Sequence, residues 1–234
     1  MRILVAAAPK TGNVWIKHIF AALYDLRLLD PIPGRSTSEL KDFVNQKRFR
    51  DRSIFHQHFD AEPELFEAMK PVTPYVVTTN RNPYDTFVSL YFFAQRHKDA
   101  FPKAHPVSMM VGKPVEHPDV LTYLAEHFPT QLYMTEAWMD SGKSIMVSYE
   151  DLYNDPYATV ERVAKRIKVA PMGSIRKAVD ASSADALKKR GGYWDVHIRT
   201  ATVGDWQSTL TEKHLKILRD SHADVIRKIG YEVV

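Results

Sequence analysis

The sequence predicts an α/β fold of three layers, in which helices cover both faces of a mostly parallel central sheet. Short apolar, β-branched runs alternate along the chain with segments of helical periodicity, which is the pattern of such folds. The first run, residues 2–8, leads directly into a tight loop and a helical pattern. The chain has 234 residues, of which 44% are hydrophobic. We therefore expect a single domain over residues 1–234 with a sizeable core.

Four runs of this kind are predicted as strands. They are residues 2–8, 52–56, 75–79 and 144–148. In a parallel sheet the carboxyl ends of the strands meet at one edge, and ligands bind there. We expect the polar residues that follow the strands to surround the site, namely Lys10, His58, Arg81 and Tyr149.

Helices are predicted between and after the strands. The apolar positions Ile16, Ile19, Phe20 and Leu23 predict a first helix that continues to Leu26 or Arg27. Further helices are expected from a cap at Thr37 or Ser38 to about 49, and over 63–69, 83–96, 119–128, 130–140, 156–169 and 211–228, with Asn82 capping the one that begins at Pro83. Residues 98–118, with their prolines, are predicted as a long excursion of the kind that forms lids or binding loops, and Leu26 to Asp30 as surface.

Composition narrows the classes of function. The chain has no cysteine, which excludes disulfides, zinc–thiolate sites and cysteine nucleophiles. No segment reaches the ~18–20 apolar residues of a membrane span, and the opening run is too short for a signal-peptide core. The net charge of +4 suits a small anionic ligand, and because no long basic stripe exists we expect no nucleic-acid partner. A cytoplasmic protein is the expected class.

The loop after the first strand predicts an anion-binding site. Pro9-Lys10-Thr11-Gly12-Asn13 separates the apolar run from a helix. Backbone N–H groups and the positive end of the helix dipole then converge on one spot, and Lys10 adds a full charge. The loop lacks the Gly-x-x-x-x-Gly-Lys-Ser/Thr pattern of nucleotide triphosphatases, which disfavours ATP-dependent phosphoryl transfer.

Four segments together resemble the sulfotransferases that use 3′-phosphoadenosine 5′-phosphosulfate (PAPS). Residues 9–15, Pro-Lys-Thr-Gly-Asn-Val-Trp, are similar to the family's 5′-phosphosulfate loop. Residues 75–85, followed by Ser89 eight residues after Arg81, are similar to its 3′-phosphate motif. Residues 148–152, Ser-Tyr-Glu-Asp-Leu, and Arg199 ahead of the Gly-Asp-Trp at 204–206 complete the set in family order.

The resemblance implies a function and a set of site residues. The reaction is transfer of a sulfuryl group from PAPS to a hydroxyl, which leaves adenosine 3′,5′-bisphosphate (PAP) and needs no metal. His58 is implied as the catalytic base, and Lys10 as the group that stabilises the leaving oxygen. The residues implied in binding the nucleotide are Lys10, Thr11, Gly12, Asn13, Val14, Trp15, Arg81, Ser89, Tyr149, Ser182, Arg199, Thr200 and Ala201.

The sequence departs from the family pattern at several of these positions. Asn13 and Val14 stand where two threonines are usual, although the Val14 backbone and the Asn13 side chain still offer N–H groups. Thr200 and Ala201 replace Lys-Gly, which removes one cation from the 3′-phosphate site, and Ala184 replaces a stacking Phe. We expect a lower affinity for the nucleotide as a result.

Aromatic and methionine side chains predict an acceptor that is a small aromatic or apolar alcohol or phenol. Those expected near His58 are Tyr91, Phe92, Phe93, Phe101, Met109, Met110, Tyr193 and Trp194.

Three alternatives stay open at this stage. His56 could serve as the base in place of His58. The protein could bind the nucleotide without turnover. The spacing of His56, His58 and Asp60 puts all three on one side of an extended segment, as in a metal-dependent hydrolase.

Overall fold

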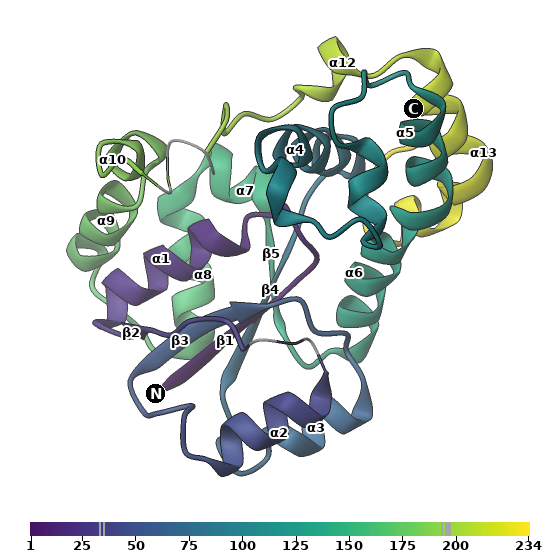
Figure 1. Ribbon diagram of the computed structural model, residues 1–234. Helices are drawn as coiled ribbons and strands as arrows, with labels where there is room; N and C mark the ends of the chain where they lie inside the picture. The colour runs from purple at the N-terminus through teal and green to yellow at the C-terminus, as the bar shows by residue number, and fades with distance from the viewer. Residues whose placement is uncertain (33, 35, 193, 195–197) are drawn as a thin grey trace.

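A five-stranded sheet forms the centre of the computed structural model, which describes residues 1–32, 34, 36–192, 194 and 198–234 (Figure 1). Its strand order is β2-β3-β1-β4-β5, and every pairing is parallel. The strands are β1 Arg2–Ala6, β2 Arg27–Leu28, β3 Ser53–Gln57, β4 Tyr75–Asn80 and β5 Ile145–Ser148. The predicted α/β class is confirmed, and each of the predicted strands is present.

Strand β2 was not predicted, because the sequence analysis assigned Leu26 to Asp30 to the surface. Arg27 and Leu28 are exposed, as expected, yet they pair with Ser53 and Ile54 at the edge of the sheet. A two-residue strand with no buried side chain leaves no alternating pattern in the sequence, so periodicity could not reveal it.

Side chains of the strands alternate between two buried layers. Ile3 and Val5 pack on one face of the sheet, and Leu4 and Ala6 on the other. The first face is covered by α1 Asn13–Tyr24, α8 Pro156–Ile167 and α9 Met172–Ala181. The second is covered by α2 Thr37–Asn45, α3 Pro63–Met69 and α6 Pro129–Ser141, and Figure 1 shows α2 and α3 together on the side of the sheet opposite α1 and α9. The expected three layers are thus present.

A further apolar cluster lies beside the sheet, centred on Phe87 and Phe128. It joins α4 Pro83–Arg96, η2 Pro106–Met110, α5 Pro118–Thr122, η3 Tyr123–His127 and α13 Glu212–Lys228. The remaining elements are η1 Lys98–Ala100, α7 Tyr149–Asn154, α10 Ala184–Lys188 and α12 Trp206–Thr209. Residues 98–118 are therefore an excursion built largely of short turns, and this cluster supports it.

Several helix ends differ from the prediction for local reasons. Helix α1 stops at Tyr24, earlier than the expected Leu26 or Arg27, because Asp25 adopts a left-handed conformation with φ 51°. Helix α2 is capped by Ser36, whose side chain and that of Glu39 form a reciprocal capping box, and not by Thr37 or Ser38. None of the helices built from the described residues has both the length and the apolar character needed to cross a bilayer.

The strand register brings the carboxyl ends of the sheet together. Val5 of β1 lies between His56 of β3 and Val77 of β4. Strands β1 and β3 end level with each other, and β4 and β5 end together farther along the same edge, at Asn80 and Ser148. Lys10, His58, Arg81 and Tyr149 follow β1, β3, β4 and β5 respectively at this edge. The parallel topology alone thus places these four residues, which are far apart in the sequence, at the same edge of the sheet.

Candidate functional site

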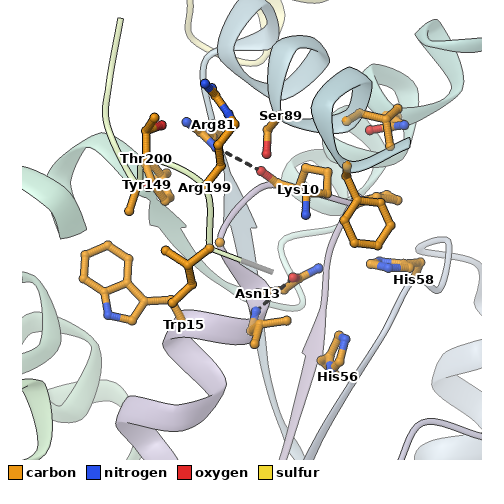
Figure 2. Close-up of a pocket in the computed structure, with 18 of the residues that line it drawn as sticks. Lys10, Asn13, Trp15, His56, His58, Arg81, Ser89, Tyr149, Arg199 and Thr200 are labelled. Atoms are coloured by element: carbon orange, nitrogen blue, oxygen red, sulfur yellow. Dashed lines mark hydrogen bonds between the residues drawn. The ribbon is translucent and has the colours of Figure 1, made fainter. Parts of the chain in front are cut away.

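A cavity of about 1010 Å³ opens at the carboxyl edge of the sheet. Most of the residues implied by the motifs line it. They are Lys10, Gly12, Asn13, Val14, Trp15, His56, His58, Arg81, Ser89, Tyr149, Arg199, Thr200 and Ala201. Figure 2 shows that the labelled side chains come from separate helices, strands and loops, and that Lys10 lies between Ser89 and His58. One cavity therefore contains both cations on which the sequence argument depends, Lys10 and Arg81.

The loop between β1 and α1 has a fixed shape. Gly12 adopts φ +102°, and a Cβ there would lie 2.8 Å from Cδ2 of Tyr149, so only glycine fits. The Thr11 hydroxyl donates to the Ala8 carbonyl at 2.7 Å and lies 2.8 Å from the Thr79 hydroxyl. The Thr11 side chain is thus buried under the loop and does not line the cavity, and the predicted contact of Thr11 with the nucleotide stays a prediction.

Two N–H groups expected to face the ligand are used inside the loop. The Val14 N–H donates to Oδ1 of Asn13 at 2.9 Å. The Asn13 side-chain amide donates to the Ala8 carbonyl at 3.4 Å. A bound anion therefore has to compete with Asn13 for the Val14 N–H, a cost that the sequence analysis did not anticipate.

Lys10 is a buried cation. Desolvation, followed by the charges of Arg96 and Arg81, lowers its pKa from 10.5 to about 7. Its Nζ lies 4.1 Å from the centre of the Phe93 ring, and it forms no ion pair with any carboxylate of the described residues. An anion in the cavity would supply the missing negative charge and raise this pKa again.

Arg81 ties three parts of the site together. Its guanidinium donates to the Thr202 carbonyl at 2.9 Å and to the Lys10 carbonyl at 3.4 Å. It also lies 4.1 Å above the Tyr149 ring, a cation–π contact. Arg81 is therefore held at the boundary between the loop and the C-terminal segment, and each terminal nitrogen of its guanidinium has a second N–H that can donate to an oxyanion.

The C-terminal segment is held over α4 by a buried carboxylate. Asp85, in the first turn of α4, accepts the backbone N–H groups of Gly204 at 2.7 Å and of Trp206 at 3.0 Å. Arg199 forms an ion pair with Asp205 and lies 4.3 Å from the Phe92 ring. Asp85 thus positions the segment that carries Arg199, Thr200 and Ala201, a role that the sequence analysis missed because an acidic residue there also suits helix capping.

Glu150 is a second positioning residue that the sequence analysis did not identify. Its carboxylate accepts the N–H of Asn82 at 2.9 Å, the hydroxyl of Ser148 at 3.1 Å and the hydroxyl of Tyr231 at 2.8 Å. This carboxylate fixes the turn after β4 against the end of β5, and so fixes Arg81 relative to Tyr149.

His58 and His56 differ in which ring nitrogen is engaged. Nδ1 of His58 lies 2.7 Å from the Ala7 carbonyl, which only accepts, so this nitrogen carries the proton and Nε2 the lone pair. Nδ1 of His56 lies 3.1 Å from Nζ of Lys17, and an ammonium only donates. The basic nitrogen of His56 is therefore directed at Lys17, which disfavours it as a base for a ligand.

The cavity wall contains two chemically different groups of side chains. We call Lys10, Arg81, Ser89 and Arg199, with the rings of Trp15 and Tyr149, the cationic half. Trp15 and Tyr149 meet edge to face at 5.9 Å. We call Phe93, Phe101, His105, Tyr123, His127 and Met134 the aromatic half. Lys10 touches both halves because its Nζ rests on Phe93.

Some expected wall residues lie elsewhere. Ser183 lines the cavity, and Ser182, which is 2% exposed, does not. Of the expected acceptor side chains, Phe93, Phe101 and Trp194 line the cavity, Tyr91 and Met110 belong to the cluster around Phe87, and Phe92 packs against that cluster. Met109 does not line the cavity, and Tyr193 lies outside the described residues. Tyr123 and His127 were missed because they sit on a π-helical turn, η3, that no periodicity predicts.

The hypothesis of a metal-dependent hydrolase finds no support in this geometry. The described residues contain no group of three or more His, Cys, Asp or Glu side chains placed to hold a metal ion. His56 and His58 lie with ring centres 6.0 Å apart, and the ammonium of Lys17 stands beside His56 where it would repel a metal cation.

Comparison with known proteins identifies the family of the chain. A family model described as the sulfotransferase domain matches residues 1–230. Cytosolic sulfotransferase 13 of Arabidopsis thaliana is 24% identical over 89% of this chain and 72% of its own length. The 3-alpha-hydroxysteroid sulfotransferase of Cavia porcellus is 24% identical over 87% of this chain and 76% of its own length.

Solved structures show the same fold. A mouse sulfotransferase complexed with PAP has a TM-score of 0.70 at 19% identity, covering 97% of this chain and 87% of its own. Retinol dehydratase in complex with androsterone and the inactive cofactor PAP has a TM-score of 0.64 at 12% identity, covering 94% of this chain and 81% of its own. The chain belongs to the sulfotransferase family. The enzyme class predicted from the motifs, a PAPS-dependent sulfotransferase, is thereby confirmed.

Proposed function

We propose that this protein transfers the sulfuryl group of PAPS to a hydroxyl of a small acceptor, with His58 as the base and Lys10 stabilising the leaving oxygen. The observation that carries the proposal is that Lys10, Arg81 and His58 line one cavity. The adenine would lie against Trp15 and Tyr149. The 3′-phosphate would be held by Arg81, Ser89 and Arg199, and the 5′ end by the loop that carries Lys10.

The chemistry follows from these positions. The acceptor oxygen attacks sulfur while the bond from sulfur to the bridging phosphate oxygen breaks. The acceptor proton passes to Nε2 of His58, and the electron pair of the broken bond stays on the bridging oxygen of PAP. Such a transfer has a loose transition state, so positioning and charge stabilisation supply most of the catalysis. Lys10 neutralises the charge that develops on the leaving oxygen.

The acceptor is expected to be aromatic or apolar. Phe93, Phe101 and Met134 are among the apolar side chains of the aromatic half. Rings and a flexible thioether favour a flat or greasy alcohol or phenol over a bare sugar. A single domain and a cytoplasmic location, both predicted from the sequence, remain part of this proposal.

A second candidate function is nucleotide binding without turnover. The observation that favours it is the hydrogen bond from the Val14 N–H to Asn13, which occupies a loop donor that a phosphosulfate would use. The tautomer of His58 favours the catalytic reading, because Nδ1 bonded to the Ala7 carbonyl leaves the basic nitrogen as Nε2.

Two measurements test the proposal and separate these candidates. Calorimetric titration with PAP is expected to show saturable binding, and no binding at millimolar PAP would remove both functions. Incubation with radiolabelled PAPS and a panel of phenols, sterols and alkyl alcohols is then expected to yield a sulfated product. Binding of PAP without transfer to any member of a broad panel would favour the non-catalytic function.

A further inference from the structure

One cation of the cavity has no role in the proposed reaction. Arg96 is the last residue of α4 and lines the same cavity as Lys10 and His58. Its Nε donates to the Phe92 carbonyl within the helix at 3.3 Å. It forms no ion pair with any carboxylate of the described residues, although it is half-buried and desolvation lowers its pKa. A desolvated arginine without a counter-charge is costly unless a ligand supplies one.

Arg96 lies on the face of α4 that borders the aromatic half. Ser89, Phe93 and Arg96 are spaced as neighbours along one side of the helix. Arg96 follows Ser89 by two turns, which places its Cα about 10 Å farther along the axis from the predicted 3′-phosphate site. Beyond it, the wall continues through aromatic rings in tilted or edge-to-face contact. Phe93 meets His97 at 4.1 Å and Phe101 at 5.9 Å, and Phe101 meets His105 at 5.2 Å.

The charge of the described wall is unbalanced. Its cations are Lys10, Arg81, Arg96 and Arg199, and its imidazoles are His56, His58, His97, His105 and His127. Among the described residues that line the cavity, the one carboxylate is Asp180, which accepts the Tyr157 hydroxyl at 2.7 Å. Tyr157 and Asp180 come from α8 and α9, beside α1, whereas the aromatic half comes from α4, the segment between η1 and η2, η3 and α6. The described residues of the aromatic half, with Arg96 beside them, thus include no carboxylate.

We propose that the acceptor carries an oxyanion, such as a carboxylate, in addition to the hydroxyl that is sulfated, and that Arg96 binds it. The inference rests on the proposed function, since it assigns Lys10, Arg81 and Arg199 to the sulfate donor. The apolar part of the acceptor lies along Phe93 and Phe101, and the oxyanion lies at the end of α4. Arg96 is then a specificity-determining residue, because an acceptor without the negative charge leaves its guanidinium desolvated and unpaired.

The test uses a matched pair of phenols, 3-(4-hydroxyphenyl)propanoate and its primary amide, titrated by calorimetry into the protein saturated with PAP. The two probes differ in charge and have nearly the same shape. The wild-type protein is expected to bind the acid about tenfold or more tightly than the amide, the usual gain of a charge-assisted hydrogen bond. Arg96→Met keeps the apolar stem of the side chain, and is expected to bring the ratio close to one.

Matched controls separate this role from a general electrostatic or structural effect. Lys98 is an exposed cation two residues further on and does not line the cavity, so Lys98→Met is expected to keep the wild-type ratio. The melting temperature and the affinity for PAP are expected to change little in Arg96→Met.

Three outcomes overturn the inference. The first is a wild-type protein that binds acid and amide equally, or binds neither. The second is an Arg96→Met protein that keeps the preference for the acid. The third is an Arg96→Met protein whose affinity for PAP falls about tenfold while its ratio is unchanged, which would assign Arg96 to the 3′-phosphate. A wild-type protein that does not bind PAP contradicts the proposed function itself, and this is measured before either phenol is added.

Discussion

The two halves of the cavity are built in different ways. In the cationic half, Lys10, Arg81 and Tyr149 follow β1, β4 and β5. The Glu150 carboxylate accepts the Asn82 N–H and holds the turn after β4, and the Asp85 carboxylate accepts the Gly204 N–H and holds the segment that carries Arg199. The aromatic half combines Phe93 of α4 and Met134 of α6 with the irregular segment between η1 and η2 and the π-helical turn η3. Sheet geometry therefore fixes the part that would bind the common donor, whereas irregular segments form the part that would select the acceptor. Substitutions can therefore alter donor binding and acceptor selection separately.

The largest effect is expected from His58→Ala, which separates transfer from donor binding. Loss of a general base typically slows a reaction by about 10²–10⁴-fold. We expect transfer to be abolished while the affinity for PAP stays near wild type, since Nδ1 of His58 is bonded to the Ala7 carbonyl and the predicted phosphate contacts come from Lys10, Arg81 and Arg199. The measurements are turnover with radiolabelled PAPS and calorimetry with PAP.

His56→Ala is the matched control for that variant. Its basic nitrogen faces Lys17, so we expect most of the activity to remain. If His58→Ala keeps its turnover and His56→Ala loses it, the base has been assigned to the wrong histidine.

Arg81→Ala tests the cationic half alone. Removing the charged partner of the 3′-phosphate is expected to weaken PAP binding by ~2–3 kcal/mol. Adenosine 5′-phosphate, which lacks the 3′-phosphate, should lose much less affinity in the same variant. An equal loss for both ligands would show that Arg81 supports the loop generally, through its bond to the Lys10 carbonyl, and does not bind the 3′-phosphate.

Gly12→Ala tests the loop that supports the cationic half. The new methyl group would stand 2.8 Å from the Tyr149 ring at a φ of +102°, so we expect a loss of about 1–3 kcal/mol in the free energy of unfolding. Gly173→Ala is the control, because this glycine lies in α9 with open space around its Cβ position. Its alanine variant should be neutral or more stable, by up to about 1 kcal/mol. Urea unfolding measures both, and equal changes in the two variants would contradict the assigned shape of the loop.

The smallest expected effect is the pH dependence of stability and of PAP binding that arises from Lys10. Its pKa of about 7 in the free protein lies below the 10.5 of the unfolded chain. Between these values the unfolded state binds more protons, so the contribution of Lys10 to stability becomes more favourable as pH rises through this window. Binding of an anion favours the charged form, so the affinity for PAP is expected to fall as pH rises above about 7.

Calorimetry in buffers of different ionisation enthalpy measures this linkage. At pH 8 the wild-type protein should take up protons on binding PAP, and Lys10→Met should not. Proton uptake that persists in Lys10→Met would assign the linkage to another group.

The sequence predicted the cationic half better than the aromatic half, for a physical reason. Lys10, Arg81 and Tyr149 each follow a buried strand directly, so a parallel sheet alone brings them to one edge. Strand β2 could not be predicted, since two exposed residues carry no periodicity. Ser183 caps α10 and lines the cavity, whereas the predicted Ser182 is buried, and the sequence pattern does not distinguish two adjacent serines.

The aromatic half depends on packing that a sequence pattern does not encode. Tyr91 and Phe93 are two residues apart on α4 and equally aromatic, yet Tyr91 is buried in the cluster around Phe87 while Phe93 lines the cavity. Whether a ring of α4 is buried or lines the cavity depends on how η2 and η3 pack against this helix. For the same reason Arg96 could not be recognised from the motifs, although it follows Phe93 by one turn.

Calorimetric titration with PAP and with its two single-phosphate analogues, adenosine 5′-phosphate and adenosine 3′-phosphate, tests the central claim most directly. If Lys10 and Arg81 grip opposite ends of one nucleotide, PAP should bind about tenfold or more tightly than either analogue. Equal binding of all three ligands, or no binding of PAP at millimolar concentration, would contradict the account.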